Sequence, residues 1–224
     1  MRASSFSVIA AKWGVALTGI ALVGFVVLHL LGNLTIFLGA SVINSYAVHL
    51  HDLGPLLWVM RVVLLLMVGV HIGLTVWLWK KSGGLRSPYK KRVPLERSPY
   101  ARYMRLSGLV IVAFLFFHLA QFTWKLFHPE YALWQDALGQ PDVFRMVVMA
   151  FQNFWVFVFY LLSVGLLAVH LSHGLGSLFQ TLGIVPYGAP HFWQLGGKVV
   201  ALFLFCGYAS IPLASFFHFL SPCR

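Results

Sequence analysis

Residues 13–38 read WGVALTGIALVGFVVLHLLGNLTIFL, a stretch with no charged side chain and a single histidine, His29. About 20 apolar residues in a helix cross a bilayer core of roughly 30 Å, so this stretch predicts a transmembrane helix. Four similar stretches follow at residues 56–79, 106–126, 147–179 and 195–219. Backbone groups in lipid must be hydrogen-bonded, and no alternating β-barrel pattern is visible, so all five are predicted helices. The sequence therefore predicts an all-α integral membrane protein, with residues 1–224 forming one five-helix bundle.

The charged residues predict the orientation of this bundle. Only 9% of the 224 residues are charged, against about 25% in soluble domains. Nine of the 16 Lys and Arg residues lie in the connection 80–105, which the positive-inside rule places in the cytoplasm. The N-terminus is then cytoplasmic and the C-terminus outside. The net charge of +11 thus reflects topology, and we expect a lipid bilayer and no nucleic acid as partner.

Four histidines lie in four different predicted helices: His29, His71, His118 and His170. An ionisable residue inside the membrane is costly, which makes each a candidate for a functional site. At 1.5 Å per residue, His29 and His118 lie about 25 and 20 Å from the cytoplasmic end, and His71 and His170 about 14 and 15 Å. These depths predict an outer pair, His29 with His118, and an inner pair, His71 with His170. Two facing imidazoles from two helices are typical of bis-histidine haem ligation in a bundle.

Other roles for these histidines fit their arrangement less well. A single membrane histidine often serves as a hydrogen bond between helices, but four of them pairing by depth favour ligation. Structural zinc requires four close ligands, which two separated pairs do not provide. Covalent haem attachment is excluded because the chain has no Cys-x-x-Cys-His motif. His173, one turn from His170, remains an alternative ligand.

A short internal repeat accompanies the outer pair. The dipeptide Thr18-Gly19 precedes His29 as Ser107-Gly108 precedes His118, with 11 residues from hydroxyl to histidine in both. Small residues such as these glycines allow a neighbouring helix or a planar group to come close. Eleven residues make about three helical turns, so neither hydroxyl reaches the histidine of its own helix.

Several motifs along the chain point to one family. They are Lys12-Trp13-Gly14-Val15-Ala16-Leu17-Thr18-Gly19, His29-Leu30-Leu31-Gly32-Asn33-Leu34, Asn44-x-Tyr46-Ala47, Trp58-x-x-Arg61 and His170-x-x-His173-Gly174-Leu175. In these motifs, and over nearly its whole length, the chain resembles the di-haem cytochrome b membrane anchors of succinate:quinone oxidoreductases and fumarate reductases. The similarity is to the type with five helices in a single polypeptide.

The resemblance implies a cofactor set and partners. Two b haems would be held by His29 with His118 and by His71 with His170, and the fifth helix would carry no ligand. A flavoprotein subunit would oxidise succinate, and an iron–sulfur subunit would pass its electrons to this chain. The chain itself would bind no dicarboxylate and would deliver electrons to menaquinone or another quinone. Its location would be the cell's inner (cytoplasmic) membrane, as a multi-pass protein.

Two further groups of residues are candidates for contacts with these molecules. Propionates of the inner haem could be neutralised by Lys12, Arg102 and Arg105, although positive-inside topology already explains most of that charge. An outer quinone site is predicted at Tyr46, His49, His51, Asp52, Trp58 and Arg61, since histidines and a carboxylate could relay protons there.

Two alternative functions stay open at this point. The first is a cytochrome b anchor of another quinone-linked dehydrogenase, such as a hydrogenase or formate dehydrogenase. The second is a transporter without haem, whose histidines relay protons.

Overall fold

The protein is all-helical, as predicted, in a computed structural model that describes residues 7–84, 99–184 and 190–221. Five helices are long and apolar enough to cross a membrane, and they cover Val8–Leu38, Pro55–Lys81, Tyr103–Thr123, Phe154–Thr181 and Phe192–Phe216. The elements in chain order are α1 (Val8–Leu34), η1 (Thr35–Leu38), α2 (Ala40–Asp52), α3 (Pro55–Gly84), α4 (Pro99–His118), η2 (Leu119–Thr123), η3 (Pro129–Ala132), α5 (Val143–Gln152), α6 (Phe154–Thr181) and α7 (Pro190–Phe216). Of these, η2 is a π-helical turn that continues α4.

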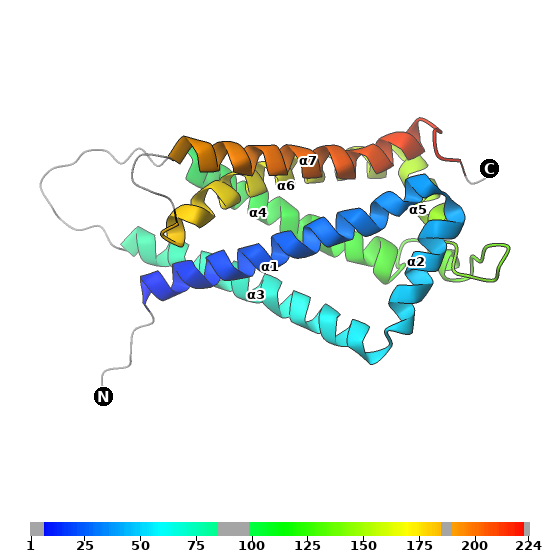
Figure 1. The fold of residues 1–224 in the computed structure, drawn as a ribbon, viewed down its shortest axis with the longest axis horizontal. Helices are drawn as coiled ribbons and strands as arrows, with labels where there is room; N and C mark the ends of the chain where they lie inside the picture. The colour runs from blue at the N-terminus through cyan, green and yellow to red at the C-terminus, as the bar shows by residue number, and fades with distance from the viewer. Residues whose placement is uncertain (1–6, 85–98, 185–189, 222–224) are drawn as a thin grey trace, which may run out of the picture.

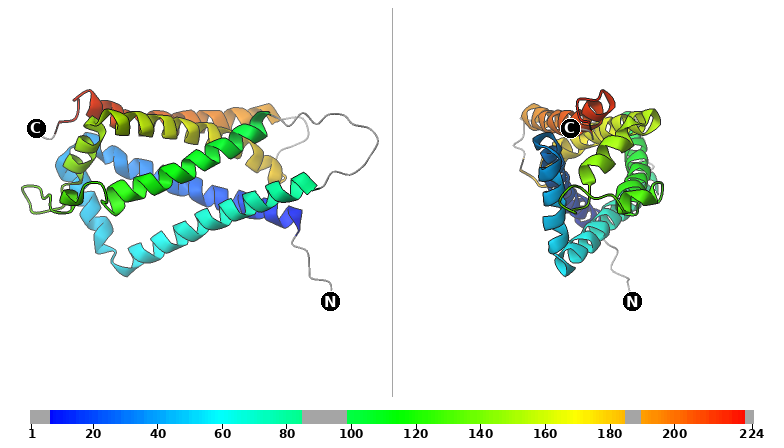
Figure 2. Two further views of the ribbon diagram at one scale, coloured as in Figure 1. Left: turned by 180° about the vertical axis from the view of Figure 1, so that it is seen from behind. Right: turned by 90° about the vertical axis from the view of Figure 1, so that its right-hand side faces the viewer.

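The long helices run side by side between two ends of the molecule (Figure 1). At one end α1 and α4 begin and α3 ends, and following the predicted orientation we call it the inner end. At the outer end, α2 crosses from the end of α1 to the start of α3, and α5 lies nearby (Figures 1 and 2). Helix α1 packs mainly on α3, α4 on α6, and α6 on α7. The pairs α1/α3 and α4/α6 therefore form two halves, with α7 as an additional helix.

Two predicted boundaries are wrong. The fourth span was predicted at 147–179, but the chain breaks at Asn153, which has an extended backbone (φ −74°, ψ 118°). Its side chain accepts hydrogen bonds from the backbone N–H groups of Trp155 and Val156 and so caps α6. The apolar run from 143 to 162 hides this break, because α5 before it is as apolar as a membrane helix.

The second correction concerns the predicted connection 80–105. Helix α3 continues to Gly84 and α4 already begins at Pro99. Lys80, Lys81, Arg102 and Arg105 are therefore helical residues at the inner ends of two spans.

At the outer end, Asn44 of α2 lies fully buried and connects three segments. Its Nδ2 donates to Asp136 Oδ2 at 3.0 Å, and its Oδ1 accepts from the backbone N–H of Phe144 at 3.0 Å. The hydrogen bond from Asn44 is the main reason why the pKa of Asp136 lies below its usual value. An apolar cluster that includes Ile43 and Phe144 surrounds this amide. Asn44 thus holds α2 against the segment between η3 and α5, which contains Asp136, and against α5 itself.

We predict that Asn44→Ala destabilises the protein by about 1–3 kcal/mol, because it leaves the buried N–H of Phe144 without an acceptor. Unfolding of the purified chain in detergent would measure this loss. Ser45→Ala is the matched control, since Ser45 makes one partly exposed bond to Gln140 Oε1 at 3.2 Å. Equal losses in the two variants would contradict the assigned role of Asn44.

Candidate functional site

The outer histidines, His29 of α1 and His118 of α4, lie next to each other. Their ring centroids are 5.8 Å apart, and the ring planes are nearly perpendicular at 88°. A phenylalanine four residues earlier packs on each ring, Phe25 at 5.4 Å and Phe114 at 5.8 Å. Two imidazole nitrogens bound to one metal at about 2 Å each lie about 4 Å apart. The 5.8 Å separation is measured between ring centroids, and a nitrogen of each ring can lie closer to the partner ring than its centroid does. The separation of the two rings is therefore compatible with one metal ion bound between them.

The inner histidines are each held by a hydroxyl from the neighbouring helix. Thr18 Oγ1 of α1 lies 3.0 Å from His71 Nδ1 of α3, and Ser107 Oγ of α4 lies 3.2 Å from His170 Nδ1 of α6. The structure therefore brings the outer pair together, and it places each inner histidine beside the hydroxyl that lies 11 residues before an outer histidine.

The two pairs lie at different levels of the bundle. Thr18 and Ser107 mark the inner level, and His29 and His118 follow them by 11 residues on the same helices. At 1.5 Å per residue the levels are about 16 Å apart. The depths counted from the sequence gave a difference of only about 5–11 Å. Those counts were low because the charged residues used as reference at the inner end do not lie at one height: Thr18 follows Lys12 by six residues, about 9 Å, whereas His71 beside it precedes Lys80 by nine, about 14 Å.

The internal repeat acts across helices. Each Thr/Ser-Gly dipeptide contacts the histidine of the neighbouring helix in its own half of the bundle. A Cβ added to Gly19 would lie 3.5 Å from His71 Cε1, and one added to Gly108 would lie 3.7 Å from His170 Cε1. The repeat is visible in the sequence, but the histidines that it contacts are not. The 11-residue spacing, which excludes the histidine of the same helix, indicates only that the contact is with another helix.

Tyr160 is a site residue that the sequence analysis missed. Its hydroxyl lies 3.3 Å from His118 Nδ1 and donates to Gln121 Oε1 at 2.8 Å. Because the single hydroxyl hydrogen goes to Gln121, the oxygen accepts from His118 Nδ1–H, and His118 Nε2 keeps its lone pair. Gln121 is buried in the π-helical turn η2. Tyr160 precedes His170 by ten residues on α6, which places it near the outer level.

The three candidate propionate partners lie at the inner end. Arg105 precedes Ser107 by two residues, and its guanidinium lies 5.2 Å from the ring of Trp79. Lys12 is exposed on α1, six residues before Thr18. Arg102 belongs to α4, but its side chain lies outside the described residues.

The six candidate quinone residues form three groups. Tyr46 and His49 line a surface recess of about 470 Å³ together with Thr35, Ser41, Val42 and Ser45. Arg61 lies over the ring of Trp58 at 5.1 Å on α3. His51 and Asp52 are exposed in the last turn of α2. The first group borders a space that a ligand could enter.

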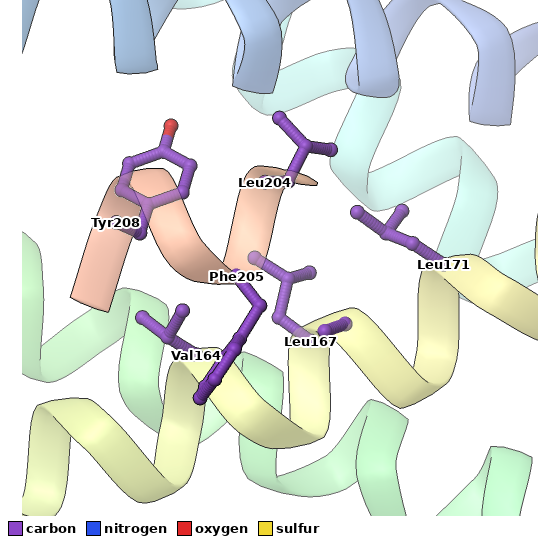
Figure 3. Close-up of a pocket in the computed structure, with 7 residues that line it drawn as sticks. Val164, Leu167, Leu171, Leu204, Phe205 and Tyr208 are labelled. Carbon is purple, nitrogen blue, oxygen red and sulfur yellow. The ribbon is translucent and has the colours of Figure 1, made fainter. Parts of the chain in front are cut away.

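A second cavity, between α6 and α7, is apolar and too narrow for water. Figure 3 shows its lining residues Val164, Leu167, Leu171, Leu204, Phe205 and Tyr208. The Tyr208 hydroxyl donates to the backbone oxygen of Val26 at 2.6 Å and so links α7 to α1. This region is helix packing and not a ligand site.

The donor set can be compared with the needs of metals and cofactors. Within the described residues, no group of three or more His, Cys, Asp or Glu side chains could hold a bare metal ion. Facing pairs of imidazoles instead suit a group that brings its other donors with it, as haem does. One polar group in this region lacks a partner: the buried Ser163 hydroxyl, two turns from His170 on α6, has no hydrogen bond.

Comparisons with known proteins add no assignment: no family model, no curated protein and no solved structure matches the chain.

We predict that Tyr160→Phe destabilises the protein by about 1–3 kcal/mol, because it leaves both His118 and Gln121 without their partner. Tyr208→Phe is the matched control. It removes one hydroxyl bond to a carbonyl and should cost about 0.5–1.5 kcal/mol. Thermal unfolding in detergent compares the two, and a larger loss for Tyr208→Phe would contradict the hydrogen-bond network assigned to Tyr160.

Proposed function

We propose that this chain is the membrane anchor and electron-transfer subunit of a succinate:quinone oxidoreductase, and that it holds two b haems between histidine pairs. The observation that carries the proposal is the arrangement of four intramembrane imidazoles at two levels, with His29 and His118 adjacent at the outer level and each inner histidine held by a hydroxyl of the neighbouring helix. Each half of the bundle gives one histidine to each pair. The resemblance of the motifs to di-haem anchors supports the same assignment.

The ligation suits electron transfer. A haem supplies reversible one-electron chemistry at its iron, and imidazoles on both faces leave no open position for oxygen. His118 and the inner histidines have their Nδ1 atoms bound within the protein, which leaves Nε2 as the nitrogen that would bind a haem iron. The two levels, about 16 Å apart along the helices, would provide a two-step path across the bilayer.

The ends of this path would face different partners. At the inner end, Lys12, Arg102 and Arg105 would neutralise haem propionates, and the basic surface would dock an iron–sulfur subunit that a flavoprotein supplies with electrons. At the outer end, the recess lined by Tyr46 and His49 would bind the headgroup of menaquinone or another quinone. Its hydroxyls and imidazole can donate hydrogen bonds to quinone carbonyls, and histidine can supply a proton near neutral pH. The membrane would be the cell's inner membrane.

The histidine pairing can be tested by haem content. His29→Ala and His118→Ala should each abolish the low-spin signal of the same haem, and His71→Ala and His170→Ala that of the other. The double variant His29→Ala/His118→Ala should then keep one low-spin haem. His29→Ala/His71→Ala should keep none. Haem extraction and electron paramagnetic resonance of the purified chain provide the counts.

His173→Ala is the control for these variants. His173 lies one turn from His170 but is not one of the four proposed ligands, so its replacement should leave both haems in place. Retention of one low-spin haem in His29→Ala/His71→Ala, together with its complete loss in His29→Ala/His118→Ala, would show that the pairing is wrong.

The quinone assignment predicts that His49→Ala lowers quinone reduction by the assembled complex on the order of 100-fold, as expected when one positioned proton donor is lost. Haem content should not change. His51→Ala and Asp52→Asn alter exposed neighbours that do not line the recess and should have little effect. If these two variants lose activity while His49→Ala does not, the quinone binds elsewhere.

A further inference from the structure

We propose that Thr18 and Ser107 are positioning residues whose hydroxyl oxygens accept the Nδ1–H of His71 and His170, fixing both tautomers and lowering the reduction potential of the inner haem. The part about the potential rests on the proposed function. The part about the tautomers concerns the protein alone.

The direction of each hydrogen bond follows from where the hydroxyl hydrogens go. Thr18 Oγ1 donates to the backbone oxygen of Gly14 at 2.7 Å, and Ser107 Oγ lies 3.2 Å from the backbone oxygen of Met104. A hydroxyl has one hydrogen, so toward the imidazole the oxygen acts as acceptor. Both histidines must then carry their proton on Nδ1.

The other ring nitrogen follows from this assignment. Since a neutral imidazole has one N–H, Nε2 of both rings is left with a lone pair for a metal.

The outer pair is held differently. His118 has the phenol of Tyr160 as partner, and the described residues provide no hydrogen bond to the ring of His29. The inner level thus has two matched hydroxyl acceptors, and the outer level has one phenol. The two haems would differ in potential for this reason.

The effect on potential has a definite sign. A ligating histidine that donates its other N–H becomes a more basic ligand. A more basic ligand stabilises the oxidised iron and lowers the reduction potential. Removing the acceptors should therefore raise the potential of the inner haem.

The variants are Thr18→Val/Ser107→Ala, which removes both acceptors, and Thr18→Ser/Ser107→Thr, which keeps them. The matched control is Thr75→Val/Ser172→Ala. Those hydroxyls lie on α3 and α6 near the same histidines, but they bond backbone oxygens, Thr75 that of His71 at 2.6 Å and Ser172 that of Val169 at 2.8 Å.

The first measurement is a redox titration of the purified haem-loaded chain. In Thr18→Val/Ser107→Ala the reduced-to-oxidised ratio of one haem should rise about tenfold at a given potential, which equals 59 mV for one electron. The other haem should not change. The conservative variant and the control should both titrate like the unaltered protein. Unchanged potentials in Thr18→Val/Ser107→Ala, or an equal shift in the control, would overturn the role in tuning.

The second measurement is nitrogen nuclear magnetic resonance of the histidine-labelled chain without haem. His71 and His170 should carry their proton on Nδ1, and Thr18→Val/Ser107→Ala should shift these two signals while the control does not. Protonation on Nε2 in the unaltered chain would overturn the proposal. This measurement also separates the two hypotheses, because a chain that binds no haem refutes the proposed function without changing the tautomers.

Discussion

Hydrogen bonds between imidazoles and hydroxyls of the neighbouring helix align the helices within each half of this bundle. A polar ring inside a bilayer has no water to bind, so it needs a partner from the protein. Thr18 supplies that partner to His71, and Ser107 supplies it to His170. Each bond joins two helices of one half, α1 with α3 and α4 with α6. The requirement to satisfy these rings thus aligns α1 with α3, and α4 with α6, at a defined height.

The rest of the molecule holds the two halves in register. Helix α7 packs mainly on α6 and also contacts α5 and α1. It approaches α1 so closely that a Cβ on Gly207 would lie 2.7 Å from Leu30 Cδ2, so a larger residue there would displace the Leu30 side chain. At the outer end, Asn44 fastens α2 to the connection after α4 and to α5.

Much of this could be predicted from the sequence because the membrane imposes simple rules. Apolar length predicted the five spans, and helical rise predicted that His29 and His118 lie at the same height. The break at Asn153 was missed because the apolar run continues through it, and only local capping reveals it. Tyr160 and the targets of Thr18 and Ser107 were missed because their contacts join residues 42, 53 and 63 positions apart, which periodicity along one helix does not reveal. Of the predicted quinone residues, Tyr46 and His49 line the recess, whereas Trp58 and Arg61 lie on another helix, α3, a separation that the sequence alone does not reveal.

Whether two histidine pairs hold two haems can be measured by the reduced-minus-oxidised spectrum of the purified chain together with its haem content. We expect an α-band of b-type haem and two haems per chain, both low-spin. A chain that is correctly folded and carries no b haem, or only one, would contradict this expectation.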